Sequence, residues 1–252
     1  HYQTDVELEQ VSSEFRITSP VGDTFDWQLG LFYYDFEMDT AGENGFLPLM
    51  GQNFLDPPFP GGFWPDGGVN FDTNTHETTS YAAFGQANWT FAEKWRMTFG
   101  ARYTAEKKAR VGSQESRPDP IFPIDAPPIA GPNVSIDEDR ESTDISPMLS
   151  VTYFPRDDLM FYASASQGFK SGGFNQLRTG EGVPGEFDDE RSRNYELGWK
   201  GTWLNRRLQV NGTVFFVDYE DFQSQTFDGQ AITVRNAGGM ESKGVEFDLV
   251  YV

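Results

Sequence analysis

The side chains able to do chemistry in this sequence are mostly carboxylates. Its 252 residues include 39 Asp and Glu, no cysteine and two histidines, His1 and His76, which lie far apart. The lack of cysteine excludes a thiol nucleophile and a thiolate zinc site. Carboxylate pairs in so acidic a chain are weak evidence for a hydrolase, and no G-x-S-x-G elbow or Walker loop occurs. We therefore predict no enzymatic activity, no catalytic residue, no metal site and no resident cofactor.

Two acidic runs, Asp137 to Glu141 and Asp188 to Glu190, could supply oxygen ligands for calcium. Neither run has the spacing of a defined calcium loop, and adjacent residues of a strand point to opposite faces. We favour the interpretation that both runs are solvated acidic surface.

Charge and hydropathy narrow the class of protein. A formal net charge of −20 at pH 7 would repel a polyphosphate backbone, which argues against nucleic-acid binding. Mean hydropathy is −0.55, and no apolar run reaches the length of about 18 residues that predicts a transmembrane helix. Aromatic residues nevertheless make up 15% of the chain, and any predicted fold must accommodate them.

Apolar and polar residues alternate with a period of two in several segments, which is the pattern of a strand with one apolar face. In 95–104 the apolar face carries Trp95, Met97, Phe99, Ala101 and Tyr103. Similar alternation predicts strands over 7–18, 24–37, 77–91, 95–110, 143–154, 159–170, 190–203, 207–220 and 232–252. The last segment could break near Gly238 and Gly239, which would raise the count from about nine strands to about ten.

The connections between these strands are short and long in turn. Tight links are expected at 19–23, 92–94, 155–158 and 204–206, and long loops near 38–75, 111–142, 171–189 and 221–231. Up-and-down membrane barrels have tight periplasmic turns and long extracellular loops, whereas structureless loops of about 30 residues are uncommon in compact soluble domains. Aromatic residues at both ends of an apolar face, such as Trp95 and Tyr103, suit the interfacial girdles of such a barrel.

We therefore predict an all-β fold, part of an antiparallel up-and-down transmembrane β-barrel. The doubtful strand count, and the end of the chain inside a predicted strand, lead us to expect one segment of a larger barrel, because a sheet in lipid must close. One alternative is a passive outer-membrane channel or an adhesion barrel. Another is a soluble all-β module such as a sandwich or propeller, since its strands would also alternate.

An ordered series of motifs resembles the barrel of TonB-dependent receptors. In chain order the motifs are SSEFRITSP (12–20), FDWQLGLFYY (25–34), YAAFGQANW (81–89), GARYT (100–104), GFKSGGFN (168–175), ERSRNYELG (190–198), NAG (236–238) and KGVE (243–246). Each motif alone is weak evidence, whereas the series in this order is strong. It covers nearly all of the chain except the long loops.

The resemblance implies more than the strand pattern does. In that family a barrel of about 22 strands encloses an N-terminal plug domain, and the plug contacts the TonB-ExbB-ExbD complex. The resemblance thus implies a receptor in the bacterial outer membrane, embedded in the lipid bilayer and lipopolysaccharide. It would import a scarce small-molecule or oligomeric ligand, such as a siderophore, a vitamin-like cofactor or a glycan fragment. No plug is visible in this sequence.

The first candidate site consists of polar residues at alternate strand positions, which therefore share one face of their strand. Arg96, Arg102, Glu196 and Lys200 are expected to face the barrel lumen, and Glu106 and Lys108 share the parity of the two arginines. They would dock the plug or line a substrate path; the other interpretation, which we favour, is the ordinary polarity of a barrel lumen.

Aromatic residues of one predicted loop are the second candidate site. Phe54, Phe59, Phe63 and Trp64 lie among prolines and glycines. Such rings would grip an apolar ligand, or else pack together to close the loop over the barrel mouth.

Overall fold

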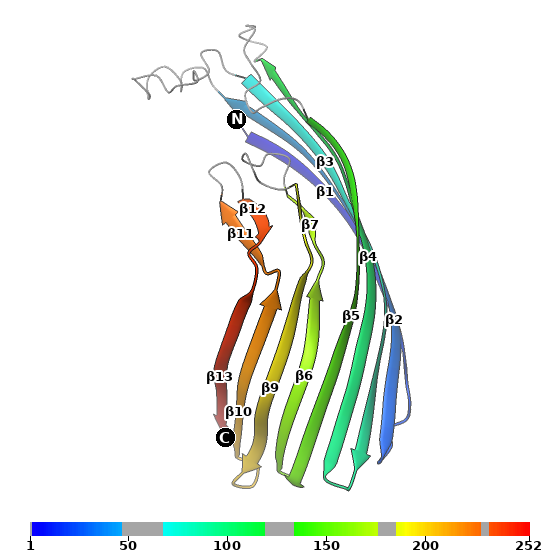
Figure 1. Ribbon diagram of the computed structural model, residues 1–252, viewed down its shortest axis with the longest axis vertical. Helices are drawn as coiled ribbons and strands as arrows, with labels where there is room; N and C mark the ends of the chain where they lie inside the picture. Colours follow the sequence, from blue (N-terminus) through cyan, green and yellow to red (C-terminus); the bar gives the residue numbers. More distant parts are fainter. Residues whose placement is uncertain (1, 47–67, 119–133, 176–184, 228–231) are drawn as a thin grey trace, which may run out of the picture.

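The computed structural model describes residues 2–46, 68–118, 134–175, 185–227 and 232–252. Every regular element in these ranges is a strand (Figure 1). The strands are β1 (Tyr2–Thr18), β2 (Phe25–Phe46), β3 (Gly68–Phe91), β4 (Trp95–Pro118), β5 (Val134–Arg156), β6 (Leu159–Lys170), β7 (Gly173–Phe174), β8 (Glu186–Phe187), β9 (Glu190–Trp203), β10 (Leu208–Glu220), β11 (Gln223–Phe227), β12 (Ile232–Asn236) and β13 (Met240–Tyr251). Within these ranges, no helix has the length and hydrophobicity needed to cross a membrane.

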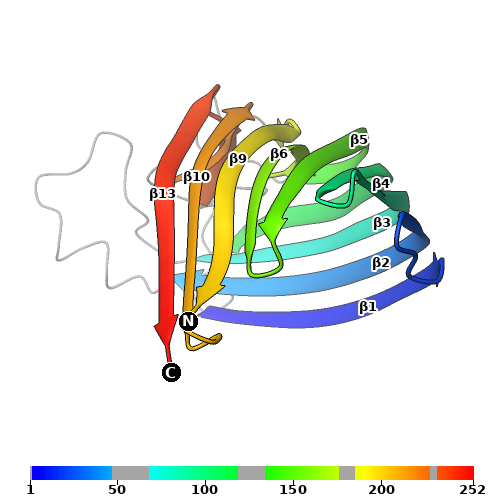
Figure 2. The same ribbon diagram turned by 90° about the horizontal axis from the view of Figure 1, so that it is seen from below.

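The long strands form one antiparallel sheet. It has nine strands in the order β1-β2-β3-β4-β5-β6-β9-β10-β13. Figure 2 shows that the sheet curls through a wide arc, with β1 and β13 at its edges. The short strands pair as β7 with β8 and β11 with β12, above β6 and β10 in Figure 1. The described residues therefore form an open part of an up-and-down barrel, which confirms the predicted fold class.

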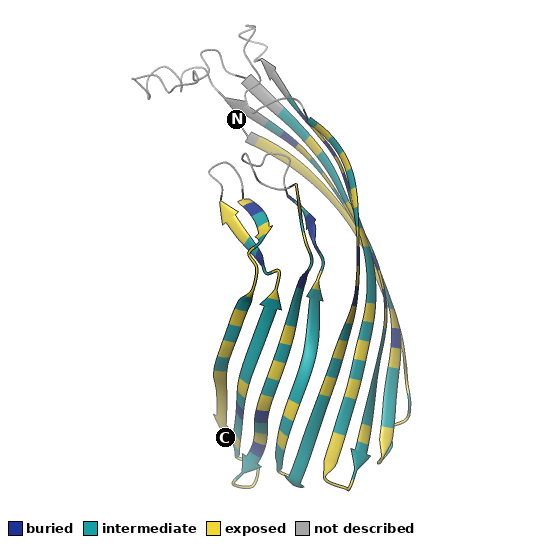
Figure 3. Ribbon diagram, viewed as in Figure 1, coloured by how far each residue is buried: buried dark blue, intermediate teal, exposed yellow. Residues whose placement is uncertain are grey.

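The two faces of the curled sheet differ as the alternation predicts. On the outer face Leu31 is 61% exposed, Tyr103 49% and Leu197 63%. Figure 3 shows the resulting bands of exposed residues along the strands. Among the described residues, Ala82 is the single buried hydrophobic residue, so the apolar side chains do not meet in a dry interior. A soluble sandwich needs such an interior, and the structure contradicts that alternative.

Aromatic rings mark both ends of the apolar outer face. Near the short turns, neighbouring ring centroids are 5.0, 6.4 and 4.5 Å apart along the series Trp89, Phe91, Trp95 and Tyr153. At the opposite end the rings of Tyr33 and Tyr81 lie 5.1 Å apart. From Tyr81 to Trp89 the strand β3 rises about 27 Å along its own axis, and at a barrel tilt of about 40° this projects to about 20 Å, comparable with an apolar band about 25 Å tall.

Several strands extend past their predicted limits, so parts of the predicted loops are wrong. The flanks of 38–75 and 111–142 are paired strand, and 171–189 and 221–231 contain β7, β8 and β11. Alternation misses these flanks because beyond the lipid both faces are polar, as in the cross-strand pair of Glu37 with Glu77. The predicted strand 232–252 divides into β12 and β13 at Gly238, whose φ of 81° favours glycine.

The tight links are present where they were expected. In the turn after β3, Ala92 and Glu93 have φ of 51° and 57°. In the turn after β9, Leu204, Asn205 and Arg206 also have positive φ. Left-handed residues in short hairpins match the twist of the flanking strands, so these turns join neighbouring long strands without splaying them.

Candidate functional site

The inner wall, opposite the outer face, carries an aromatic series on β2 and β3. Phe32, Tyr34 and Phe36 share this face because they are alternate residues of β2, and the rings of Tyr34 and Phe36 stack with centroids 6.3 Å apart. Phe84 of β3 joins them. Its ring occupies the space that a Cβ would take on Gly30, its cross-strand partner. The wall is therefore partly apolar, where the sequence predicts polar residues.

Arg102 of β4 lies among these rings. Its guanidinium carbon is 5.2 Å from the ring centroid of Phe32 and 5.7 Å from that of Phe84, within the range of cation–π attraction. Its Nε donates a hydrogen bond to Oγ1 of Thr104 at 3.1 Å. Within the described part of the chain no carboxylate lies at ion-pair distance from Arg102. Within the described residues, its contacts are therefore with the two rings and with Thr104.

Arg96 lies on the same face of β4, toward the short-turn end. Its Nε donates to Oγ1 of Thr90 at 3.4 Å, and its guanidinium lies 6.0 Å from the ring centroid of Phe154. The strand rises about 20 Å between Arg96 and Arg102. The two predicted arginines therefore belong to different levels of the wall.

Glu196 and Lys200 lie on β9, farther around the same wall. Glu196 accepts a hydrogen bond from Nδ2 of Asn194 at 2.7 Å, and Nζ of Lys200 lies 5.9 Å from the ring centroid of Tyr162. Neither contact involves Arg102 or Arg96. The structure does not gather the predicted polar residues into one site, and their plug-docking or path-lining roles stay predictions.

The predicted aromatic contact loop falls outside the described residues. Phe54, Phe59, Phe63 and Trp64 all lie within 47–67. The flanking strands β2 and β3 are the ones that carry the aromatic series of the inner wall. The role of this loop in ligand contact stays a prediction.

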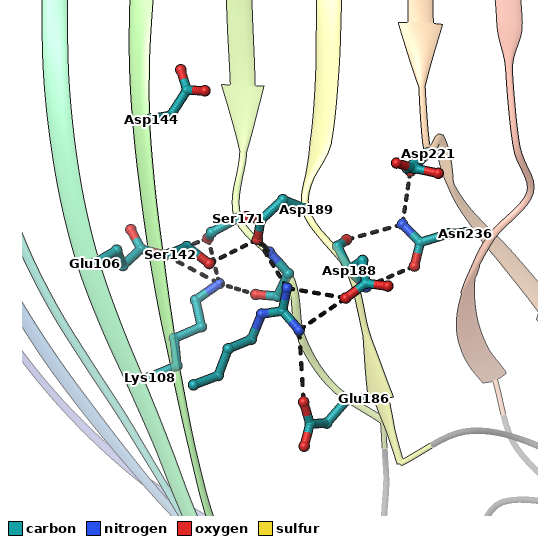
Figure 4. Close-up of polar contacts among 12 residues, drawn as sticks. Glu106, Lys108, Ser142, Asp144, Ser171, Glu186, Asp188, Asp189, Asp221 and Asn236 are labelled. Carbon is teal, nitrogen blue, oxygen red and sulfur yellow. Dashed lines mark hydrogen bonds and ion pairs between the residues drawn. The ribbon is translucent and has the colours of Figure 1, made fainter.

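Sequence reasoning missed a polar network at the upper end of the inner wall (Figure 4). Arg140 of β5 pairs with Asp188 at 3.3 Å, with Asp189 at 3.1 Å and with Glu186 at 3.6 Å. All three acids belong to the connection that leads from β6 to β9. One arginine therefore ties this connection to the wall.

Lys108 of β4 holds the start of the same connection. Its Nζ donates hydrogen bonds to Oγ of Ser171 and to the carbonyl oxygen of Gly172, both at 2.8 Å. It also lies 3.3 Å from Oε1 of Glu106, and Ser171 donates to that same carboxylate. Glu106 and Lys108 thus face the lumen, as their parity predicts, and they anchor a loop there.

A buried arginine joins two connections. Arg110, whose side chain is 3% exposed, pairs with Glu138 at 2.6 Å. Its guanidinium lies 5.0 Å from the ring centroid of Phe174 and donates to the carbonyl oxygen of Asn175. The Asn175 amide in turn donates to the carbonyl oxygen of Val234 at 2.8 Å and accepts from its N–H at 2.6 Å. The β6–β9 connection and β12 are therefore bound to each other and to the wall.

Asp189 is the central acceptor of this network, outside the apolar band. It accepts hydrogen bonds from the N–H of Gly172 at 2.8 Å, from Oγ of Ser142 at 2.7 Å and from Nη2 of Arg140 at 3.1 Å. Burial alone would raise the pKa of this carboxyl, but the three hydrogen bonds and the charge of Arg140 outweigh it. The pKa therefore lies below the ordinary value of 3.8, and Asp189 stays charged at neutral pH.

The interpretation of 188–190 as merely solvated surface is wrong for two of its residues. Asp189 accepts the bonds just described, and Glu190 is 9% exposed and accepts from the N–H of Gln223 at 2.7 Å. Among the described residues, no group of three or more His, Cys, Asp or Glu has the arrangement of a metal site. The one local signal was Gly172-Gly173, where a Cβ would collide with Phe187, so the backbone is held close to another segment of the same chain.

An apolar outer face, two aromatic girdles and a polar and aromatic inner wall define the class of transmembrane β-barrels of the bacterial outer membrane. The family model "TonB dependent receptor-like, beta-barrel" matches residues 2–252. The chain therefore belongs to the TonB-dependent receptor family, as part of its β-barrel, and its location is the outer membrane.

The chain is similar in sequence to proteins that are named as receptors. The chain is 24% identical over 242 residues to the ferric-pyoverdine 358 receptor of Pseudomonas putida, which covers 91% of this chain and 26% of that protein. It is 25% identical over 169 residues to the pesticin receptor of Yersinia pestis, with 66% of this chain and 23% of that protein covered. The chain thus spans about a quarter of the length of these relatives.

Solved structures share the fold. The ferric yersiniabactin uptake receptor FyuA of Yersinia pestis superposes with a TM-score of 0.72 at 20% identity, over 98% of this chain and 33% of that one. The copper transporter OprC gives a TM-score of 0.66 at 14% identity, over 99% of this chain and 36% of that one. At these identities the likeness concerns the fold alone.

Proposed function

We propose that the protein containing this chain is an outer-membrane receptor that imports a ferric siderophore, with energy supplied through TonB-ExbB-ExbD. The observation that carries the proposal is the match to the TonB-dependent receptor barrel over residues 2–252, and the placement of the Arg102 guanidinium among aromatic rings on the inner wall suggests the kind of ligand. Family membership and the names of the relatives support a receptor for an iron chelate.

The chemistry of the wall suits an anionic ligand with apolar or aromatic parts. The forked guanidinium of Arg102 would bind a carboxylate or another oxyanion of the chelate, while Phe32 and Phe84 would contact its flat portions. A glycan fragment would stack on the rings but leave the charge unused. A vitamin-like cofactor with an acidic group remains the nearest other ligand.

The rest of the receptor is part of the proposal. The chain would be a segment, 1–252, of a larger barrel that encloses a plug domain, with the connections from β2 to β3, β4 to β5, β6 to β9 and β10 to β13 outside the cell. Glu196 and Lys200 would face the plug, and the outer face would contact lipid and lipopolysaccharide. The transport path would then run past Arg102 when the plug moves.

Uptake by the full-length receptor tests this function. Cells that carry it as their sole siderophore receptor would be starved of iron and offered single ferric siderophores labelled with radioactive iron. We expect Arg102→Ala to weaken binding of the accepted siderophore by about 10- to 100-fold, the usual effect of losing a hydrogen bond to a charged group. Lys107→Ala is the matched control, because Lys107 lies on the outer face and pairs with Asp139 at 3.5 Å.

Loss of TonB separates active import from a passive channel. We expect deletion of TonB to abolish uptake while binding at the cell surface persists. Uptake that continues without TonB, or steady conductance of the purified protein in a planar bilayer, would support the passive channel instead. Failure of every siderophore to bind would overturn the proposed ligand class.

A further inference from the structure

The backbone ladder between β5 and β6 stops partway up the wall. Its last pair on the loop side is Met148 with Ser166. Beyond that pair, β5 continues to Val134 with β4 as its neighbour, and β6 continues to Lys170 with β9 as its neighbour. Among the described strands this leaves a seam between 134–147 of β5 and 167–170 of β6, and Figure 1 shows the two strands diverging there.

Proline at position 147 accounts for the place where the ladder stops. Alternate residues of an antiparallel strand direct their backbone groups to opposite neighbours. The amide of Phe154 donates to Lys94 on the β4 side, and the carbonyl oxygen of Ile145 accepts from the Gln167 side chain of β6 at 3.4 Å. Odd-numbered residues of β5 therefore face β6. Pro147 is one of them and has no N–H, so the next hydrogen-bonded pair would lack one of its two bonds.

The seam has a lower and an upper limit. It begins near the upper aromatic girdle, because Ile145 is the cross-strand partner of Tyr103. Higher up, the β6–β9 connection lies against β5, where Ser142 and Arg140 bind Asp189. The open stretch is thus 143–147 of β5 opposite 167–170 of β6, and it is called the lateral window below. Its lower end lies at the height of the outer leaflet.

An ion pair passes through the lateral window. Nε of Arg191 lies 3.0 Å from Oδ1 of Asp144, whose side chain is 4% exposed. Alternation places Asp144 on the inner wall with Ser142, whereas Arg191 belongs to the outer face of β9 with Tyr195. A pair that joins the two faces of a sheet needs an interruption in the ladder between them. Side chains therefore close the wall here, where a ladder closes it lower down.

We propose that the seam is a lateral window of the barrel and that the Arg191–Asp144 pair is its latch. When the pair parts, an apolar group dissolved in the outer leaflet can enter the lumen beside Arg102, because Ser146 on the inner rim is the cross-strand partner of Arg102. Parting breaks one partly exposed ion pair and no ladder hydrogen bond. This inference depends on the outer-membrane location but not on the ligand that is imported.

Thiol labelling at the inner rim tests the window. The full-length protein with Ser146→Cys, reconstituted into lipid vesicles, would be treated with a pyrene maleimide, which partitions into the membrane. Ser150→Cys is the matched control, because it lies on the same face of β5 but is flanked by ladder partners on both sides, Thr98 and Ser164. Each rate would be divided by the rate with a water-soluble maleimide, which corrects for access through the lumen.

Removing the latch should open the window. We expect Asp144→Asn to accelerate pyrene labelling of Ser146→Cys by about 3- to 5-fold, the population change when a partly exposed ion pair is lost. Labelling of Ser150→Cys should not change. Arg191→Gln should act alike from the other side of the pair, which keeps the test valid where Asp144→Asn does not fold. Asp158→Asn is the control for the substitution itself, since it removes a pair of 3.0 Å with Arg156 near the short turns.

Hydrogen exchange resolved to single residues tests the seam without any substitution. The amides of Thr143 and Ile145 face the window and should exchange about 10-fold faster than those of Ser142 and Ser146, which face β4. Uniform protection over 142–146 would mean that the wall is continuous and would remove the window. Pyrene labelling of Ser146→Cys that neither latch variant accelerates, or that is already fast with the latch intact, would remove the role of the ion pair.

Discussion

Arg110 and Glu138 are direct cross-strand partners on β4 and β5, and their side chains form an ion pair of 2.6 Å in which the arginine is 3% exposed. The same guanidinium faces the ring of Phe174 at 5.0 Å and the carbonyl oxygen of Asn175. A pair within the wall therefore also fixes the connection that leads from β6 to β9. Such a pair is costly to break on one side, because the remaining charge loses its partner.

Replacing the arginine should release the connection while the barrel stays folded. We expect Arg110→Met to accelerate hydrogen exchange of the backbone amides in 171–175 and 232–236 by about 10- to 100-fold, the effect of losing ~2 kcal/mol of local stability. Amides of β4 and β9 at the height of the lipid should exchange as before. Lys107→Met, on the exposed outer face, is the control. Unchanged exchange in 171–175 would show that other contacts hold the connection.

Acid should loosen the same connection through Asp189. Since the pKa of this carboxyl is below its ordinary value of 3.8, its bonds contribute stability above that value and lose it as the pH falls through the lowered pKa. We expect protection of the Gly172 amide, corrected for its intrinsic exchange rate, to be constant between about pH 5 and pH 7 and to fall in stronger acid. Asp189→Asn should remove this dependence; an identical acid response in that variant would assign it to another group.

The sequence predicts the parts of the fold that lipid constrains. From Trp95 to Tyr103 one face of the strand meets hydrocarbon and the other meets a wet lumen, so hydropathy alternates and the outer face is identified correctly. Where water touches both faces, as at the pair of Glu37 and Glu77, the strand continues without a pattern. The strand then ends where its pairing with the neighbouring strand ends. Local sequence patterns do not reveal that position.

The inner site is less predictable because its contacts join distant segments. Arg140 and Asp189 meet across 49 residues of sequence, and nothing in either local pattern indicates the other. The alternation predicts that Arg102 faces the lumen, but it says nothing of the aromatic rings around it, which come from two other strands. The predicted polarity of the lumen therefore missed its apolar part.

Glycine at position 30 makes the aromatic wall possible. A Cβ on Gly30 would collide with the ring of Phe84, so Gly30→Ala must displace that ring from Arg102. We expect a loss of about 1–3 kcal/mol in the free energy of unfolding, typical of overpacking, measured by reversible urea unfolding in lipid vesicles. Gly239→Ala is the control, since the nearest atom to its Cβ would be the Tyr219 carbonyl oxygen at 3.6 Å. Adding Phe84→Leu to Gly30→Ala should recover part of the loss; no recovery would place the collision elsewhere.

Adjacent residues of β5 offer the sharpest test of which side meets lipid. Leu149 is 40% exposed and pairs with Phe99 on the outer face, whereas Ser150 pairs with Thr98 on the inner wall. We expect Leu149→Arg to lower the free energy of unfolding in vesicles by about 2–4 kcal/mol, the cost of an arginine near the bilayer midplane. Ser150→Arg should change it by less than about 1 kcal/mol, because its guanidinium stays hydrated in the lumen. The two variants have the same charge, the same strand and the same depth, so their difference isolates the solvent on each side. Equal costs, or a larger cost for Ser150→Arg, would mean that lipid does not cover the outer face, and the assignment of the inner wall to a transport path would then be wrong as well.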